Sequence, residues 1–142
     1  VIGENPLYVS AIRLVMAQRL VRKLDDATKQ QYQPDAGTIE KLNEIINSLP
    51  DGTEHPSLDN LQLFKAGSSP DNPYGYRGQI ALREQFQMNG EIRSLLEHSK
   101  ILSTSEIENA AIKSGMRTML QDGILKAIAG ETTMEEIYRV IG

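Results

Sequence analysis

Apolar residues recur at helical spacing along the first 24 residues, which predicts a helix from Pro6 to Leu24. Proline suits its first position, because the missing N–H would have no helical partner there. The apolar arc is wide, so we expect this helix to be buried on two sides. An amphipathic membrane anchor is less favoured, since Gln18 and Arg19 would interrupt its lipid face.

The middle of the chain alternates polar loops with short elements. Residues 25–35 are polar and predict a loop, and Asp35 is expected to cap a helix over residues 36–49. Residues 61–66 and 79–86 alternate weakly between apolar and polar side chains. They predict two antiparallel strands joined by a long loop of turn-forming residues.

From residue 87 onward the pattern is helical. Helix starts are expected at Asn89, at overlapping capping boxes that begin with Ser103 and Ser105, and at Thr132 or Thr133. Gly115 and Gly130 are expected to end the helices before them, because the residue after a helix often needs a positive φ. We expect the helices after residue 103 to form a compact bundle.

Together these elements predict an α+β fold that is predominantly helical. It would comprise an N-terminal helix, a small lobe with a short antiparallel β-hairpin, and a C-terminal helical bundle. The corresponding boundaries are residues 1–24, 25–86 and 87–142. A chain of 142 residues is long enough for one domain of ordinary size or two small ones.

Charge is distributed unevenly. Residues 1–24 carry +3, because four basic side chains oppose one acidic side chain, and the remainder of this −4 chain carries −7. A basic first helix on an acidic body suggests an internal or intersubunit electrostatic contact, although a solvated helix face explains the charges equally well. The acidic balance argues against nucleic acid as a partner.

The ends of the chain and its hydropathy indicate no targeting segment. No apolar stretch reaches the roughly 18 residues of a membrane span, and no basic region marks a signal peptide. The chain does not begin with Met, which suggests an excised fragment.

Signatures of catalysis are missing from the sequence. It contains no phosphate loop, nucleophile elbow, zinc-protease helix or dinucleotide fingerprint. The absence of cysteine excludes disulfides, thiolate zinc sites and a cysteine nucleophile. Two histidines, His55 and His98, are too few for a His-rich metal cage. We therefore predict no catalytic residue, metal or cofactor in this chain.

Three segments resemble motifs of the type II secretion and type IV pilus assembly ATPases. Residues 17–24 (AQRLVRKL) resemble that family's AQRLVRKLC helix, and residues 75–81 (GYRGQIA) resemble its GYKGRIGI segment. Residues 115–136, GMRTMLQDGILKAIAGETTMEE, resemble its C-terminal signature GMRTL..DGL.K...AGETTLEEV. The three motifs stand in the family's order over most of the chain.

The resemblance implies that this chain is the C-terminal end of such a motor, downstream of the nucleotide-binding core and its catalytic groups. The parent would be a cytoplasmic, hexameric, Mg-ATP-dependent motor at the inner face of the bacterial membrane, acting with an inner-membrane platform protein. Residues 1–24 would be the terminal helix of the core. The helical tail would transmit motion or maintain the hexamer. A stand-alone helical adaptor that binds a partner through an apolar groove is the alternative.

The same resemblance suggests roles for single residues. Contacts to the core or a neighbouring subunit are expected from Arg13, Gln18, Arg19 and Arg22, because guanidinium groups suit interfacial carboxylates. Solvation or pairing within the chain is the alternative for the arginines. Structural roles are expected for Gly75, Tyr76, Gly78, Gly115, Arg117, Asp122 and Gly130. Among these, Arg117 and Asp122 would orient the tail helices.

One departure from the family concerns zinc. Many members carry a four-cysteine zinc site in the small lobe. Here Asp25 and Thr28 stand at the first cysteine pair, and Ser68 and Asp71 at the second. Two carboxylates and two hydroxyls do not make a soft tetrahedral site, so we predict no zinc. Apolar packing, partly from the helix over residues 36–49, would hold the lobe together.

Overall fold

The computed structural model describes residues 6–98 and 103–142. In chain order the elements are α1 (Pro6–Ala11), β1 (Leu14–Leu24), β2 (Gln30–Tyr32), α2 (Ala36–Asn47), β3 (Leu63–Lys65), β4 (Tyr76–Gln87), α3 (Gly90–His98), α4 (Thr104–Lys113), α5 (Met119–Ile128) and α6 (Met134–Ile141). This composition confirms an α+β fold with a helical C-terminal part. Each helix in the described ranges is too short or too polar to cross a membrane.

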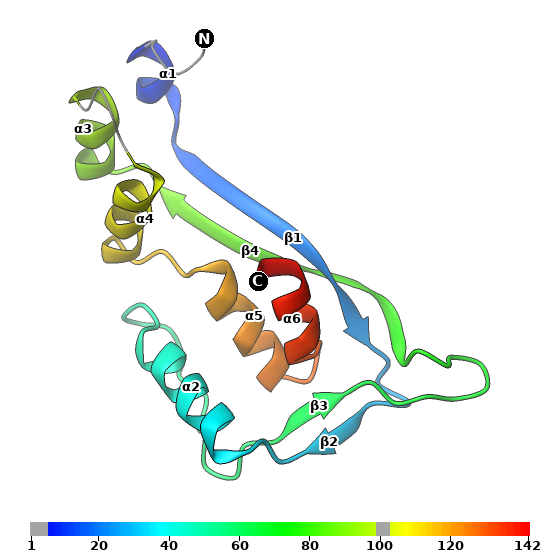
Figure 1. Cartoon of the computed structure of the whole chain (residues 1–142). Coiled ribbons are helices and arrows are strands. Elements are labelled where there is room, and N and C mark those ends of the chain that lie inside the picture. Colours follow the sequence, from blue (N-terminus) through cyan, green and yellow to red (C-terminus); the bar gives the residue numbers. More distant parts are fainter. Residues whose placement is uncertain (1–5, 99–102) are drawn as a thin grey trace.

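A long two-stranded ribbon is the frame of the molecule (Figure 1). In it β1 and β4 run antiparallel, with Leu14 opposite Gln87 at one end and Leu24 opposite Tyr76 at the other. The register shifts between Arg22 and Leu24. A second, much shorter antiparallel pair is formed by β2 and β3.

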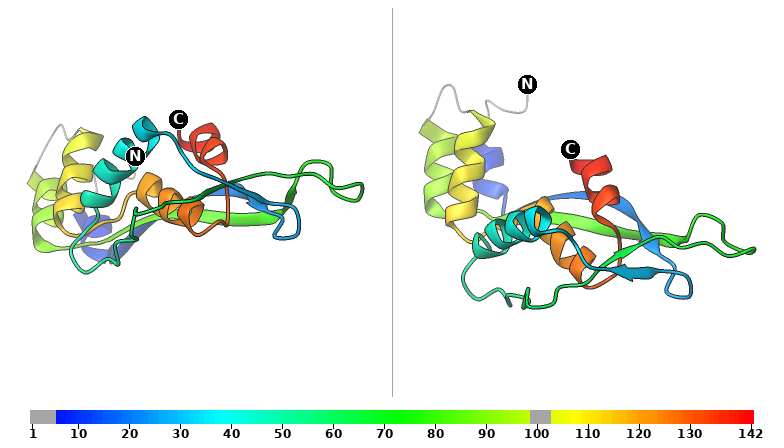
Figure 2. Two further views of the ribbon diagram at one scale, coloured as in Figure 1. Left: turned by 90° about the horizontal axis from the view of Figure 1, so that it is seen from below. Right: turned by 60° about the horizontal axis from the view of Figure 1, so that its bottom comes forward.

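Helices gather at two places along the ribbon (Figure 2). α5 and α6 pack along it, whereas α1, α3 and α4 gather where β1 begins and β4 ends. Within the part of the chain that the structure describes, the buried apolar residues accordingly form three clusters. The ribbon meets α5 and α6 around Val21, Leu82 and Ile137. α2 and β3 meet α5 around Ile124, and α3 and α4 meet around Ile92.

The predicted helix over Pro6–Leu24 is wrong beyond its first turns. α1 ends at Ala11, and Leu14–Leu24 is a strand. A run that is apolar all round fits a buried strand as well as a buried helix, so periodicity alone cannot separate the two. Pairing with β4 decides the outcome, because it satisfies the backbone groups along the facing edge of each long strand.

The predicted hairpin is also wrong, although both of its strands exist. β3 pairs with β2, which lies in the segment predicted as loop, and β4 pairs with β1. β2 consists of three residues, two of them glutamines, and therefore carries no alternating apolar signal. A strand of 12 residues such as β4 needs a long partner, and β1 with 11 residues supplies it.

The helix ends follow the local signals, but the predicted single bundle does not form. Asp35, Ser103 and Thr133 are N-caps, and Gly115 and Gly130 have φ of 91° and 72°. Nevertheless α3 and α4 pack with α1, away from α5 and α6. The ribbon offers α5 and α6 an apolar surface of its own, and that surface separates the two helix pairs.

Candidate functional site

A buried glutamate ties α6 to β1. The side chain of Glu136 is only 1% exposed, and Thr133 caps the turn that presents it. Its carboxylate accepts hydrogen bonds from Arg22 N–H (3.0 Å), the Arg22 guanidinium (2.5 Å) and Arg139 (2.7 and 2.8 Å). The bonds from Arg139 and Arg22 hold the pKa of this carboxyl well below its usual range, against the opposing effect of burial.

The turn before α6 binds the same part of β1. Glu131 O accepts from Leu24 N–H (2.9 Å), and the Thr132 hydroxyl donates to Arg22 O (2.8 Å). The Arg22 guanidinium also lies over the Tyr76 ring, 4.1 Å from its centroid. The end of β1 is therefore held by backbone, hydroxyl and carboxylate groups together.

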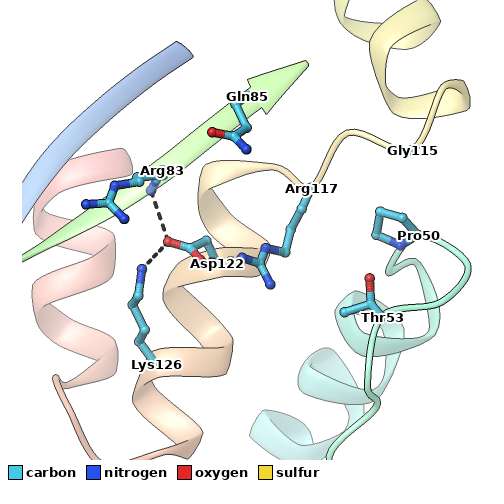
Figure 3. A pocket seen from close by; sticks show the side chains of 8 residues that line it. All are labelled: Pro50, Thr53, Arg83, Gln85, Gly115, Arg117, Asp122 and Lys126. Atoms are coloured by element: carbon cyan, nitrogen blue, oxygen red, sulfur yellow. Dashed lines mark hydrogen bonds and ion pairs between the residues drawn. The ribbon is translucent and has the colours of Figure 1, made fainter. Parts of the chain in front are cut away.

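A second buried carboxylate, Asp122, ties α5 to β4 (Figure 3). It accepts from Arg83 N–H (2.9 Å) and pairs with Lys126 and with Arg117 (3.0 Å). Lys126 also donates to Ala81 O (2.7 Å). Two side chains one helical turn apart thus satisfy the backbone of β4 at Ala81 and Arg83.

These contacts distinguish the two ends of the ribbon. Alternate residues of an antiparallel strand send their N–H and C=O groups to opposite edges. We call the edge of each strand that faces away from the other its outer edge. Met88 N–H donates to Arg13 O (2.9 Å), so even-numbered residues of β4 face β1 and odd-numbered ones face the outer edge. By the register, even-numbered residues of β1 face its outer edge.

The anchored end of the ribbon comprises residues 22–24 of β1 and 81–83 of β4, whose outer-edge groups bind α5, α6 and their connecting turn. The two stretches are staggered, because the register places residues 81–83 opposite residues 18–20. The open end comprises residues 14–20 and 85–87. There, within the described part of the chain, no third strand pairs with either outer edge. Leu14, Met16 and Leu20 are about half exposed on one face of the open end, at 48%, 51% and 50%. Val15, on the other face, is 38% exposed.

A polar hollow of about 430 Å³ lies beside the open end of β4 (Figure 3). Arg83 and Gln85 border it from the strand, and Arg117 and Lys126 from α5 and the segment before it. Pro50 and Thr53 form the opposite wall. Basic side chains outnumber the single carboxylate, Asp122, in this hollow.

A third carboxylate, Asp25, organises the small lobe. It accepts from Asn72 Nδ2 (2.7 Å) and Ala27 N–H (3.1 Å), and these bonds lower the pKa of its carboxyl. Asn72 Nδ2 also donates to Tyr76 O (3.2 Å), and Gly75 N–H donates to Asn72 Oδ1 (3.2 Å). A Cβ on Gly75, whose φ is 67°, would lie 2.1 Å from a neighbouring carbonyl oxygen, so this crossing requires glycine.

The residues at the family's zinc positions do not fit that metal. The Asp25 carboxylate is engaged in hydrogen bonds, and the buried Thr28 hydroxyl is a neutral group that has no hydrogen-bond partner among the described residues. Across residues 6–98 and 103–142, no three His, Cys, Asp or Glu side chains are grouped so that they could hold a metal. The hydrogen-bonded pair of Asp25 and Asn72 cross-links the segments that zinc would join.

The other residues singled out from the sequence are spread along the ribbon. Gln18 and Arg13 are exposed, whereas Arg19 donates to Val140 O (2.5 Å) on α6. The Tyr76 hydroxyl lies 3.3 Å from the Thr133 hydroxyl, and Gly78 has φ of 81°. Gly75 and Gly78 therefore serve a backbone bend in this structure.

Sequence reasoning missed Glu136 and Asn72. Glu136 lies in a capping pattern, which predicts an ordinary helix start and does not indicate that its side chain is buried beside Ile137. The basic Arg139, three residues later on the same helix, was the available signal. Asn72 sits in a run of turn formers, where an amide is expected in any case, so no local signal marked it.

Comparisons with known proteins agree with the motifs. A family model described as type II/IV secretion system protein matches residues 3–139. The chain is 39% identical to type II secretion system protein E of Xanthomonas campestris pv. campestris, over 96% of this chain and 22% of that protein. It is 32% identical to type IV pilus assembly ATPase PilB of Thermus thermophilus, over 95% of this chain and 14% of that protein. It is 34% identical to the protein transport protein HofB homolog of Escherichia coli, over 94% of this chain and 25% of that protein. The chain thus spans a quarter or less of the length of these relatives.

Proposed function

The chain belongs to the type II/IV secretion system protein family, and on that basis we propose that it is the C-terminal part of a hexameric motor ATPase that powers type IV pilus assembly or type II secretion. The core that binds Mg-ATP would lie in the part of the motor that this chain does not span, and the chain would supply no catalytic residue. The motor would work in the cytoplasm, at the inner face of the bacterial membrane, against an inner-membrane platform protein.

The open end of β1 carries this proposal. A strand with apolar side chains on both faces is typical of the interior of a larger sheet. The exposure of Leu14, Val15 and Met16 departs from that pattern unless another part of the protein covers them. Left uncovered, an apolar edge of this length promotes aggregation. We infer that the ATPase core packs on β1 and extends the ribbon along its outer edge.

The anchored end suits the chain to transmitting motion. Glu136 fixes α6 to β1, and Asp122 fixes α5 to β4. A displacement of β1 by the core would therefore carry both helices with it as one body. In this way the chain would pass on movement of the core or stabilise the contacts between subunits.

The four residues expected at the interface divide into two pairs. Gln18 lies at the open end and Arg13 directly precedes it, and both are exposed. They are the better placed to meet the core. Arg19 and Arg22 bind α6, so they would contact the core only with the part of each guanidinium that remains exposed.

The proposal is tested on a longer chain that includes the nucleotide-binding core. Met16→Asp places a charge on the proposed interface and should lower both ATP hydrolysis and the fraction of hexamer, because burying an unpaired carboxylate is costly. Tyr74→Asp is the matched control, since Tyr74 is 76% exposed in the loop between β3 and β4, away from the open end. The 142-residue chain alone should hydrolyse no ATP.

Two results would contradict the proposal. One is ATP turnover by the 142-residue chain itself. The other is a Met16→Asp motor that keeps its activity and its hexamer, which would show that the core leaves β1 uncovered and would favour an adaptor. Sedimentation velocity and a coupled phosphate-release assay provide the two readouts.

A further inference from the structure

The outer edge of β4 becomes accessible just beyond its anchored residues. At the outer edge, Arg83 N–H donates to Asp122 and Ala81 O accepts from Lys126. Gln85 is the next residue whose backbone faces that edge, and in the described residues its N–H and C=O meet neither a strand nor a side chain. Gln85 is also exposed. One donor and one acceptor are thus presented in strand geometry.

This edge lies in a groove rather than on an open surface. Gln85 and Gly115 border both the 430 Å³ hollow and a second hollow of about 350 Å³ that continues toward Gln87 and Met116. Gly115 forms part of the opposite side, and a Cβ built on it would meet no atom within 4 Å. The groove therefore has room for a further length of main chain beside β4.

The groove is basic at its anchored end. The Arg117 side chain is 45% exposed there, and the Lys126 side chain is 22% exposed. Arg83 is exposed and, among the residues described, has no ion-pair partner for its guanidinium. Asp122 compensates only part of this charge. Figure 3 shows Arg83 and Arg117 on opposite sides of Asp122, so a carboxylate entering the groove from the side of Pro50 and Thr53 would meet Arg117 first.

We propose that this groove binds an extended, acidic segment of another protein chain, which adds a short strand to the outer edge of β4 and places a carboxylate beside Arg117. Backbone hydrogen bonds at Gln85 would supply the pairing, as in other cases of strand addition. The basic side chains would supply the preference for an acidic segment. This inference goes beyond the motor function and does not depend on it.

The probe is a fluorescein-labelled peptide in which Thr and Val alternate around one central Glu, measured by fluorescence anisotropy with the 142-residue chain. Saturable binding is expected, and replacing the Glu by Gln should weaken it about threefold. Two further peptides carry N-methyl groups on alternate backbone amides. One peptide is methylated at the odd-numbered amides and the other at the even-numbered amides. Because a strand uses only one set at an edge, one of these peptides should lose binding and the other should keep it.

Variants of the protein assign the contacts. Gln85→Pro removes the N–H at the outer edge while leaving the bonds to β1 intact, and should weaken binding roughly three- to tenfold. Arg117→Gln should weaken binding of the Glu peptide but leave binding of the Gln peptide unchanged. Lys65→Gln is the matched control, because it removes one exposed charge on β3 and should have no effect. Circular dichroism checks that each variant is folded. The comparison of the two N-methylated peptides uses the unmodified chain, so it tests the proposal even if a variant does not fold.

Several outcomes would overturn the proposal. One is the absence of binding by any peptide. A second is equal binding by both N-methylated peptides together with displacement by inorganic phosphate, which would reduce the groove to an oxyanion site. A third is a concentration-dependent dimer that Gln85→Pro abolishes while the peptides fail to bind, since that result would assign the groove to a second copy of this chain.

Discussion

The two ends of the ribbon use the same pair of strands in opposite ways. At the anchored end, Glu136 and Asp122 bring side-chain oxygens to backbone N–H groups, so the outer edges are closed by the chain's own helices. At the open end, apolar residues such as Met16 remain exposed beside outer edges that no described strand covers. The difference indicates that edge protection is local. Closing one end stabilises the chain, and the open end is where we propose that partners bind.

The largest expected effect comes from releasing the anchored end of β1. Glu136→Gln should lower the free energy of unfolding by about 3 kcal/mol, because it breaks a buried charge pair. The loss should not be larger, because Arg22 and Arg139 are about half exposed and water can solvate them when the carboxylate is removed. Glu135→Gln, on the exposed neighbour, is the control. Urea denaturation of both variants measures the effect, and equal stabilities would refute the anchoring role of Glu136.

The pH dependence of stability should reveal the same contact. The folded pKa of Glu136 lies well below its ordinary value of 4.5, so the unfolded state takes up a proton first as the pH falls. The stabilisation is complete above about pH 4.5 and is lost as the pH falls toward the folded pKa. Urea titrations of the unmodified chain and of Glu136→Gln should therefore converge in acid. Parallel curves would exclude the proposed cause.

Releasing the anchored end of β4 should cost less. Asp122→Asn is expected to lower the free energy of unfolding by about 2 kcal/mol, because it weakens the bonds to Lys126 and Arg117 while its amide oxygen can still accept from Arg83 N–H. Asp59→Asn, at an exposed loop position, is the control. A loss larger than that of Glu136→Gln would reverse the order of the two anchors.

The smallest effects are expected in the lobe beyond the anchored end. Asn72→Ala should lower the free energy of unfolding by about 1 kcal/mol by removing the partner of Asp25, with Gln62→Ala as the exposed control.

A chelator should leave the thermal midpoint of unfolding unchanged. About one zinc per purified chain, or a lower midpoint after chelation, would show that a metal holds this lobe after all.

Local chemistry made the helix ends predictable. The capping box of Ser103 and Glu106 and the cap at Asp35 require only residues three positions apart. The same holds for the positive φ of Gly115 and Gly130, which follows from how helices end. At these positions the information needed lies within a single turn of chain.

Distant pairing was not predictable from the same reasoning. The apolar run of β1 suits a helix as well as a strand. Only pairing with β4, which begins 52 residues after Leu24 ends the first strand, decides between them. Glu136 and Arg22 are separated by 114 residues. The resemblance to the family indicated which segments matter, but not that charged anchors join them.

The division of the apolar core has a consequence for how the molecule opens. Leu120 and Met134 pack against both the cluster around Val21, Leu82 and Ile137 and the cluster around Ile124. These two clusters therefore form a single cooperative unit. Among the described residues, the cluster around Ile92 shares no member with either. α3 and α4 can therefore detach while the remainder stays folded. Their amides would then exchange with deuterium well before those of α5 and β4, through an excursion that leaves the rest of the fold in place.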